Sequence, residues 1–216
     1  MKYEVTDLTK VRRRPERAIY DRDLVHSILD EALVAHIGFV DDAGVPRVIP
    51  TAFSRIGEDV VIHGSTRNLL MTTLAKGGRA CITVTLIDSL VAGRSGFGCS
   101  MDYRSVVIYS SAEVVPDSEK PDCLERIVQD IFPGHRIRDH RENELKATLV
   151  LRFPIREVSA KVRDAGCLDV EDDYASDRWA GRFPVSLEIG PAENCPRLGP
   201  EVVIPEIAAG LPSRKK

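Results

Sequence analysis

The stretch of sequence that decides the fold reads Val61-Ile62-His63-Gly64-Ser65-Thr66-Arg67-Asn68. Its β-branched start predicts a strand that ends at His63, and the small and hydroxyl residues that follow favour a turn. Leucines then recur at helical spacing between residues 69 and 74, and Gly77-Gly78 predicts the end of a short helix over 67–76. A strand is thus predicted to deliver the chain directly to a helix N-terminus.

A helix N-terminus favours an anion because it carries free backbone N–H groups and the positive end of the helix dipole. Here Ser65 and Thr66 add hydroxyl donors, Arg67 adds a guanidinium and Asn68 adds an amide. Together these groups suit a phosphate. The alternative is that Ser65 or Thr66 only caps the helix and that Arg67 is solvated, since any capped helix shows a similar pattern.

The rest of the chain consists mainly of short runs rich in Val, Ile, Thr and Tyr, separated by turn residues, which is typical of antiparallel strands. Apolar residues at helical spacing predict one helix that follows its cap at Asp21 and another over 124–131. The charged stretch 135–143 is predicted to be an exposed loop. Strands are predicted over residues 36–40, 46–53, 60–63, 79–86, 90–94, 103–115, 148–155 and 157–162.

Regular alternation of strand and helix is absent, so a parallel α/β architecture is not expected. An antiparallel barrel fits better, because a sheet that closes on itself has no free edges. The predicted fold class is therefore mainly β (β+α), with an N-terminal helix and short inserted helices. We expect an N-terminal arm over residues 1–20, one barrel domain over 21–187 and a C-terminal tail over 188–216.

The composition is that of an ordinary globular protein, with 43% hydrophobic and 29% charged residues among 216. A formal net charge of −3 gives no reason to expect a nucleic-acid partner, and the basic run Arg12–Arg17 is predicted to be a solvated arm. No apolar stretch approaches the ~18 residues of a membrane span, and the polar N-terminus lacks the apolar core of a secretory signal. Five widely spaced cysteines without a C-x-x-C pair favour free thiols, a cytoplasmic location and no metal site.

Six segments, in order over roughly residues 12–187, carry a resemblance to a known family. They are Gly44-Val45-Pro46-Arg47-Val48-Ile49-Pro50-Thr51, His63-Gly64-Ser65, Arg94-Ser95, Ser100-Met101-Asp102-Tyr103-Arg104-Ser105-Val106-Val107, Ser159-Ala160-Lys161-Val162-Arg163 and Trp179-Ala180-Gly181. Each is weak alone, but the ordered set is specific. It resembles the FMN-binding split-barrel family, in the branch that contains the nitroimidazole-resistance proteins and the chains related to pyridoxamine 5'-phosphate oxidase.

The resemblance implies a six-stranded antiparallel Greek-key split barrel that forms a homodimer with FMN at the dimer interface. It places the flavin phosphate at residues 63–68, in agreement with the anion prediction, and the flavin ring along the strand that ends Pro50-Thr51-Ala52-Phe53. Backbone groups of this strand would bond the polar edge of the ring, and small Ala52 would leave it space. Without the resemblance, Thr51 and Phe53 show only ordinary strand alternation.

The resemblance also implies roles for individual side chains. His63 is the expected catalytic residue and a proton donor, with a structural hydrogen-bonding role as the alternative. Arg104 would contact the flavin phosphate or ribityl chain, unless it pairs with a surface carboxylate. Trp179 would pack on the partner's flavin or anchor the C-terminal segment. The cofactor-binding residues expected are Pro50, Thr51, Ala52, Phe53, His63, Gly64, Ser65, Arg67, Asn68, Ser100, Tyr103, Arg104 and Trp179.

One departure from the family bears on the substrate. True pyridoxamine-phosphate oxidases carry an Arg-Leu-His-Asp-Arg-like run after a C-terminal tryptophan, whereas this chain continues Trp179-Ala180-Gly181-Arg182-Phe183-Pro184. Oxidation of pyridoxamine phosphate is therefore doubtful. The expected function is an FMN-dependent oxidoreductase that acts on a small nitroaromatic or pyridoxal-like molecule. The alternative is a non-catalytic module that stores or senses flavin or heme, with His63 as the first candidate for a heme ligand.

Overall fold

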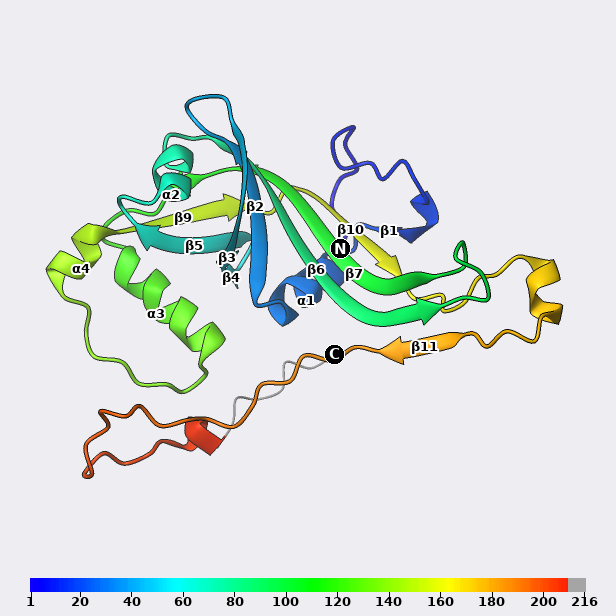
Figure 1. Ribbon diagram of the computed structural model, residues 1–216. Coiled ribbons are helices and arrows are strands. Elements are labelled where there is room, and N and C mark those ends of the chain that lie inside the picture. The colour runs from blue at the N-terminus through cyan, green and yellow to red at the C-terminus, as the bar shows by residue number, and fades with distance from the viewer. Residues whose placement is uncertain (210–216) are drawn as a thin grey trace.

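The computed structural model describes residues 1–209, which form two antiparallel sheets around one core (Figure 1). One sheet has the strand order β1-β10-β7-β6-β2-β3, with β11 paired to β6, and the other has the order β4-β5-β9-β8. The strands are β1 (Ala18–Ile19), β2 (Val34–Val40), β3 (Pro46–Ala52), β4 (Ser54–Ile56), β5 (Asp59–Ser65), β6 (Arg79–Ala92), β7 (Ser100–Ser111), β8 (Glu113–Val114), β9 (Thr148–Pro154), β10 (Glu157–Arg163) and β11 (Gly181–Pro184). The helices are α1 (Arg22–Glu31), α2 (Leu69–Leu74), α3 (Lys120–Ile131) and α4 (Glu142–Ala147), with 3-10 turns η1 (Pro15–Arg17), η2 (Glu171–Ala175) and η3 (Glu206–Ala209).

Two segments run from one sheet into the other and hold the sheets together. β3 continues through Phe53 into β4, and β7 continues through Ala112 into β8. Between the sheets the core is filled by fully buried side chains, among them Ile62, Ile108 and Phe153. Burial of a side chain of this size contributes about 1.5–3 kcal/mol, so the enclosed core accounts for a large share of the stability.

The N-terminal part of the chain packs against this barrel. Asp21 caps α1 by accepting a hydrogen bond from the backbone N–H of Leu24, at 3.2 Å, as predicted. The apolar side of α1 buries Val25, Ile28 and Leu29 in the core. Within the predicted arm 1–20, the side chain of Tyr3 is also buried in the core and β1 pairs with β10. Among the described residues no helix is long and apolar enough to cross a membrane.

The predicted mainly β, antiparallel split barrel is confirmed, but several elements differ from the prediction. The strands predicted over 79–86 and 90–94 form one strand, β6, because the irregularity between Ile87 and Ser89 bends the strand without ending it. α4 begins inside the predicted loop 135–143, supported by a hydrogen bond from the backbone N–H of Arg141 to Glu144. β1, β4 and β11 had no predicted counterpart. The strand predicted over 103–115 is divided at Ala112 into β7 and β8, and β5 continues two residues beyond its predicted end at His63 because its pairing with β9 extends to Ser65.

The hairpin of β6 and β7 extends well beyond the core, and β11 and η2 lie along its outer part (Figure 1). The residues after β11 run back beneath the barrel in the same view. Most large apolar side chains of this outer part are exposed, among them Leu90, Phe97 and Phe183, and buried charges hold its described residues together instead.

The carboxylate of Asp102 on β7 is the centre of that arrangement, with a side chain that is 1% exposed. It accepts hydrogen bonds from Ser89 Oγ at 2.9 Å, from the backbone N–H of Ala165 at 3.2 Å and from Arg182 at 3.3 Å, and it pairs with buried Arg163. Burial disfavours the carboxylate, but the bonds from Ala165, Ser89 and Arg182 and the charge of Arg163 outweigh it and lower the pKa of Asp102. The group thereby ties β6, β10 and β11 to β7.

Replacement of Asp102 by Asn is expected to lower the free energy of unfolding by about 3–5 kcal/mol, because Arg163 stays buried without its countercharge. Urea denaturation measures this loss. Since the folded-state pKa is lowered, the stabilisation is present above the ordinary carboxyl pKa of about 4 and is lost as pH falls through the folded-state value. The difference in free energy of unfolding between the wild type and Asp102→Asn is therefore expected to become smaller in acid.

The matched control is Asp172→Asn in η2, where the carboxylate is exposed and has no ion pair among the described residues. Its free energy of unfolding is expected to stay within about 0.5 kcal/mol of the wild type. Equal stability of the two variants would show that Asp102 does not hold the hairpin.

Candidate functional site

The corner where β5 meets α2 contains the stretch His63-Gly64-Ser65-Thr66-Arg67-Asn68. β5 pairs with β9 along its whole length, which fixes the backbone as far as Ser65. Gly64 lets α2 pack directly on the strand, because a Cβ atom there would lie 2.9 Å from Cγ of Met71, which is itself 1% exposed. A larger residue at position 64 would therefore push α2 and the loop before it away from β5.

The loop is held in a tight turn by its own polar groups. Asn68 caps α2, because its Oδ1 accepts hydrogen bonds from the backbone N–H groups of Leu70 at 2.9 Å and of Met71 at 3.4 Å. The cap is thus Asn68 rather than Ser65 or Thr66, and the helix begins at Leu69, two residues later than predicted. Asn is as good an N-cap as Ser, so residue type alone does not fix the start of the helix.

The groups left at the surface of this corner are donors. Ser65, Thr66 and Arg67 are exposed, and Ser65 Oγ accepts a hydrogen bond from the backbone N–H of Arg67 at 3.2 Å. Within residues 1–209 no carboxylate pairs with the guanidinium of Arg67. Two hydroxyls and an unpaired guanidinium within three residues suit a phosphate, as the sequence predicts.

His63 extends from β5 on the side of the sheet that carries Val61 and Val150, since Val150 is its direct partner on β9. The imidazole is exposed, and no described residue forms a hydrogen bond with it. The protein atoms around the ring still disfavour the charged form, so desolvation lowers the pKa of His63. At neutral pH this imidazole is therefore uncharged, and it can donate from one ring nitrogen and accept or bind a metal at the other.

β3 carries the predicted ring-binding residues and is the last strand of its sheet. One of its edges pairs with β2, and the other edge pairs with no described strand. Proline is tolerated on an edge strand, and Pro50 lies on this one. Pro50 and Ala52 face outward from the sheet, whereas Thr51 points inward. An open edge offers backbone N–H and C=O groups to a ligand, which fits the predicted contacts with a flavin ring. Phe53, in contrast, is 4% exposed and belongs to the core.

The residues predicted from β7 lie elsewhere in the chain. Ser100 and Tyr103 belong to the first residues of β7. The outer part of the β6–β7 hairpin, where β7 begins, lies far from α2 (Figure 1). Arg104 pairs with Glu31 at 2.6 Å and with Asp88 at 2.8 Å. These hydrogen bonds to Glu31 and Asp88 raise the pKa of Arg104 and occupy its donors, so the predicted pairing with carboxylates is what the single chain shows.

Trp179 lies on the same outer part of the molecule. The residue is 65% exposed, and its indole contacts the ring of Phe183, with centroids 5.6 Å apart. A Cβ atom on Gly181 would lie 2.5 Å from the indole, so a larger residue at position 181 would displace the exposed ring of Trp179. The pairing of β11 with β6, more than the indole, anchors this segment. A single chain therefore does not bring Ser100, Tyr103 or Trp179 to the corner at 63–68.

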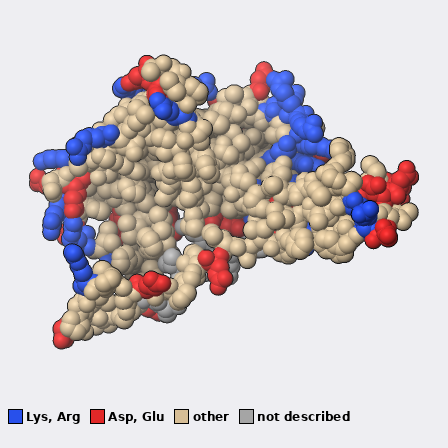
Figure 2. Space-filling model, in the orientation of Figure 1, with Lys and Arg blue, Asp and Glu red and all other residues tan. Residues whose placement is uncertain are grey.

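The outward face of the large sheet was missed by the sequence analysis. Val34, Val40 and Val48 are 44%, 59% and 67% exposed on neighbouring strands of this face, and His36 lies among them opposite Pro50. Figure 2 shows uncharged residues across the face of β2, β6 and β7, with charged side chains gathered at its rim. The sequence of β2 contained a sign of this face, since Val34, His36 and Val40 lie at alternate positions on one side of the strand. Such alternation does not tell which face of a sheet is covered by other parts of the chain.

His26 and His36 differ in their hydrogen-bond partners. His26 Nε2 lies 2.9 Å from the hydroxyl of Tyr3 and 3.5 Å from Glu58. The imidazole of His36, like that of His63, has no hydrogen-bond partner among residues 1–209. Within the same residues no group of three or more His, Cys, Asp or Glu side chains is arranged to hold a metal ion, and all five cysteines are free.

The fold is that of a split-barrel protein. Its β5–α2 corner carries a loop whose donors suit a phosphate, and the strand β3 has an open edge. A model of the pyridoxamine 5'-phosphate oxidase family matches residues 21–162, and the chain belongs to this family of flavin-binding proteins. The resemblance found in the sequence is thereby confirmed. No curated protein sequence matches the chain.

Solved structures give more detail. The flavocytochrome Anf3 from Azotobacter vinelandii is 38% identical, over 94% of this chain and 95% of that one, with a TM-score of 0.89. The FAD and heme binding protein from Mycobacterium smegmatis is 31% identical, over 88% and 94%, with a TM-score of 0.84. A candidate 5-nitroimidazole antibiotic resistance protein from Bacteroides thetaiotaomicron, at 20% identity over 67% and 86% and a TM-score of 0.58, shares the fold.

The lowered pKa of His63 gives a titration that NMR can follow. The midpoint of its ring proton shift is expected below the ordinary histidine value of about 6.5, because the folded protein disfavours the imidazolium. The unfolded chain then binds more protons in this window, so the contribution of His63 to stability falls as pH drops from 6.5 through the folded-state pKa. His63→Gln assigns the resonance by removing it. A midpoint at or above 6.5 would contradict the burial argument.

Proposed function

We propose that this chain is a flavin-dependent oxidoreductase that works as a homodimer on a small molecule. The observation that carries the proposal is similarity along almost the whole chain to two proteins named for a flavin or as a flavocytochrome. The family resemblance implies FMN, whereas one of those relatives is named for FAD. Both flavins contain a ribityl 5'-phosphate, so the same phosphate-suited loop serves either of them.

In this proposal the residues of the chain have separate tasks. Ser65, Thr66 and Arg67 bind the phosphate, and the open edge of β3 bonds the polar edge of the ring beside small Ala52. The bound flavin supplies hydride or electron transfer. His63 is uncharged at neutral pH and is placed at the end of the same strand as the phosphate loop, so it orients a substrate or moves a proton to it. A nitroaromatic or pyridoxal-like substrate remains part of this proposal.

The proposed dimer uses the outward face of β2, β3, β6 and β7. Large exposed apolar areas on a folded chain mark interaction surfaces, and this face carries the exposed valines Val34, Val40 and Val48 and shows few charged side chains (Figure 2). In this proposal a second copy that covers the outward face brings its own β6–β7 hairpin towards the β5–α2 corner of the first chain. Ser100, Tyr103 and Trp179 of one chain would then contact the flavin at the corner of the other. The dimer thus explains why one chain leaves these residues far from His63.

A second candidate function is a protein that binds flavin and heme together. It is favoured because the two relatives above 30% identity are described as a flavocytochrome and as a FAD and heme binding protein. The donor set of this chain fits, since His36 and His63 each present an imidazole without a partner among the described residues. Heme bound at one of them would show as a Soret band in the absorbance spectrum of the purified protein, beside the flavin bands.

Flavin binding is tested by titration of the flavin-free protein with FMN and with FAD, followed by fluorescence quenching. Arg67→Gln is expected to raise the dissociation constant about tenfold to a hundredfold, because a charge-assisted hydrogen bond of about 1.5–3 kcal/mol is lost. Arg12→Gln, an exposed arginine in the N-terminal arm, is the matched control and is expected to leave the constant unchanged. A colourless protein that binds neither flavin would overturn the proposal.

The dimer is tested by Val48→Asp in analytical ultracentrifugation. The valine is 67% exposed in the single chain, so the fold tolerates a charge there, but a buried aspartate would weaken an interface over β3. We expect a two-copy mass for the wild type and a shift towards one copy for the variant. Val203→Asp, at a residue that is 87% exposed in the C-terminal segment, is the control. A wild-type mass of one copy would exclude the homodimer.

A further inference from the structure

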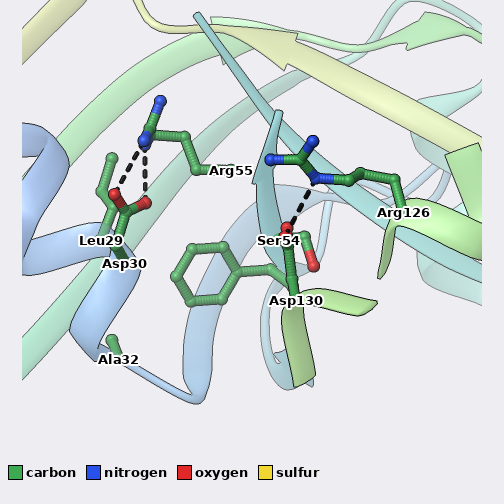
Figure 3. Close-up of a pocket in the computed structure, with 8 residues that line it drawn as sticks. Leu29, Asp30, Ala32, Ser54, Arg55, Arg126 and Asp130 are labelled. Atoms are coloured by element: carbon green, nitrogen blue, oxygen red, sulfur yellow. Dashed lines mark hydrogen bonds and ion pairs between the residues drawn. The ribbon is translucent and has the colours of Figure 1, made fainter. Parts of the chain in front are cut away.

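A pocket of about 260 Å³ lies between α1, β4 and α3, apart from the loop at 65–68. Figure 3 shows the Arg55–Asp30 pair on the α1 side of Ser54 and the Arg126–Asp130 pair on its α3 side. Its volume is below the roughly 300–1,000 Å³ of pockets for drug-sized ligands, so it suits a smaller molecule. The lining residues are Leu29, Asp30, Ala32, Phe53, Ser54, Arg55, Arg126 and Asp130.

The hydroxyl of Ser54 is the unusual group in this pocket. Ser54 is 4% exposed, and its Oγ is buried without a hydrogen-bond partner in the described part of the chain. Nearly all buried polar groups in proteins have a partner, and a buried hydroxyl without one costs free energy of folding. The residue lies opposite Val61 in the pairing of β4 with β5, so the sheet fixes the position of its backbone. A bound ligand would supply the missing partner.

The two arginines differ in the donors that they have left. Arg55 donates from Nε and Nη2 to Asp30, both at 2.7 Å, and from Nη1 to the carbonyl of Gly57 at 2.7 Å. Arg126 donates from Nε to Asp130 at 3.1 Å, and within residues 1–209 its terminal nitrogens have no partner. Arg126 is therefore the arginine that can donate to a ligand.

The charges of the lining restrict the class of ligand. Among the eight lining residues, two guanidiniums and two carboxylates sum to zero, so a ligand with a full charge would leave these side chains with an excess charge. An uncharged acceptor such as a carbonyl oxygen meets the donors of Arg126 and Ser54 without that excess. Leu29, Ala32 and Phe53 offer an apolar wall to the remainder of the molecule.

We infer that this pocket is a binding site for a small uncharged molecule with a carbonyl or amide group on an apolar body. The carbonyl oxygen accepts hydrogen bonds from Ser54 and Arg126, and the apolar body packs on Phe53. The site is separate from the proposed phosphate loop and does not depend on flavin. Phe53 alone belongs both to this pocket and to the residues predicted to contact a flavin ring.

The test is calorimetric titration of the full-length protein with benzamide, with benzoate as the charged analogue of the same shape and toluene as the analogue without a polar group. Saturable binding of benzamide that is tighter than that of both analogues is expected. Ser54→Ala is expected to weaken it about threefold to tenfold and Arg126→Gln about tenfold, as one neutral and one charge-assisted hydrogen bond are lost. Arg136→Gln, an exposed arginine in the following loop, is expected to change nothing.

Two further measurements separate this site from a structural role and from the proposed function. Ser54→Ala is expected to keep or raise the thermal unfolding midpoint, because the hydroxyl has no partner to lose. Arg126→Gln is expected to leave FMN and FAD affinity unchanged, so the pocket and the flavin proposal fail independently. Lack of saturable benzamide binding, tighter binding of benzoate, or equal affinity in Ser54→Ala, Arg126→Gln and the wild type would overturn the inference.

Discussion

The structure depends on the two places where the chain leaves one sheet and enters the other. At Phe53 and at Ala112 the backbone turns through the buried layer, so that β3 and β7 belong to the large sheet while β4 and β8 belong to the small one. Both residues are buried, at 4% and 7% exposure, and pack in the common core. Since both crossings join the same two sheets, the sheets cannot separate without exposing that core, and the cooperativity of the barrel follows from this constraint. The crossing at Phe53 also sets the angle at which β3 presents its open edge.

A filled core determines where ligands can bind. The buried side chains between the sheets pack against one another in one cluster, as in small barrels whose interior is filled by side chains, so we expect a cofactor to lie on the outside. The outside offers hydrogen bonds where regular pairing stops, which happens at the edge of β3 and at the end of β5. Gly64 adds to this by letting α2 approach the strand, so that the donors at 65–67 are held in a fixed turn. The pocket beside Ser54 also lies outside the filled core. It forms where the three-residue strand β4 leaves space between α1 and α3.

The sequence predicted the parts of this arrangement that depend on local order. The strand that contains His63, the polar groups that follow it, the cap at Asp21 and the mainly β class follow from residue types and periods, and the family resemblance was confirmed. What it did not predict depends on contacts between distant segments. The continuity of β6 through Asp88 needs the partner strand β7, and the burial of Asp102 needs Arg163 and Arg182 from later strands. Likewise no local pattern reveals that Arg104 meets Glu31, or that the hydroxyl of Ser54 has no partner.

The outer hairpin shows why charge, rather than apolar burial, stabilises the part of the chain farthest from the core. Asp169 has a fully buried side chain that accepts bonds from the backbone N–H and the guanidinium of Arg94, at 3.0 and 2.9 Å, and Arg94 also lies over the ring of Tyr174. With the Asp102 group, this makes two buried charge clusters along one extension. Such clusters contribute little net stability but fail sharply when one member is lost, so they fix one conformation of the hairpin. In a homodimer, a fixed hairpin would allow one chain to place Ser100 and Tyr103 at the β5–α2 corner of the other chain. A mobile hairpin would have to be ordered on contact, and the loss of conformational entropy would weaken that contact.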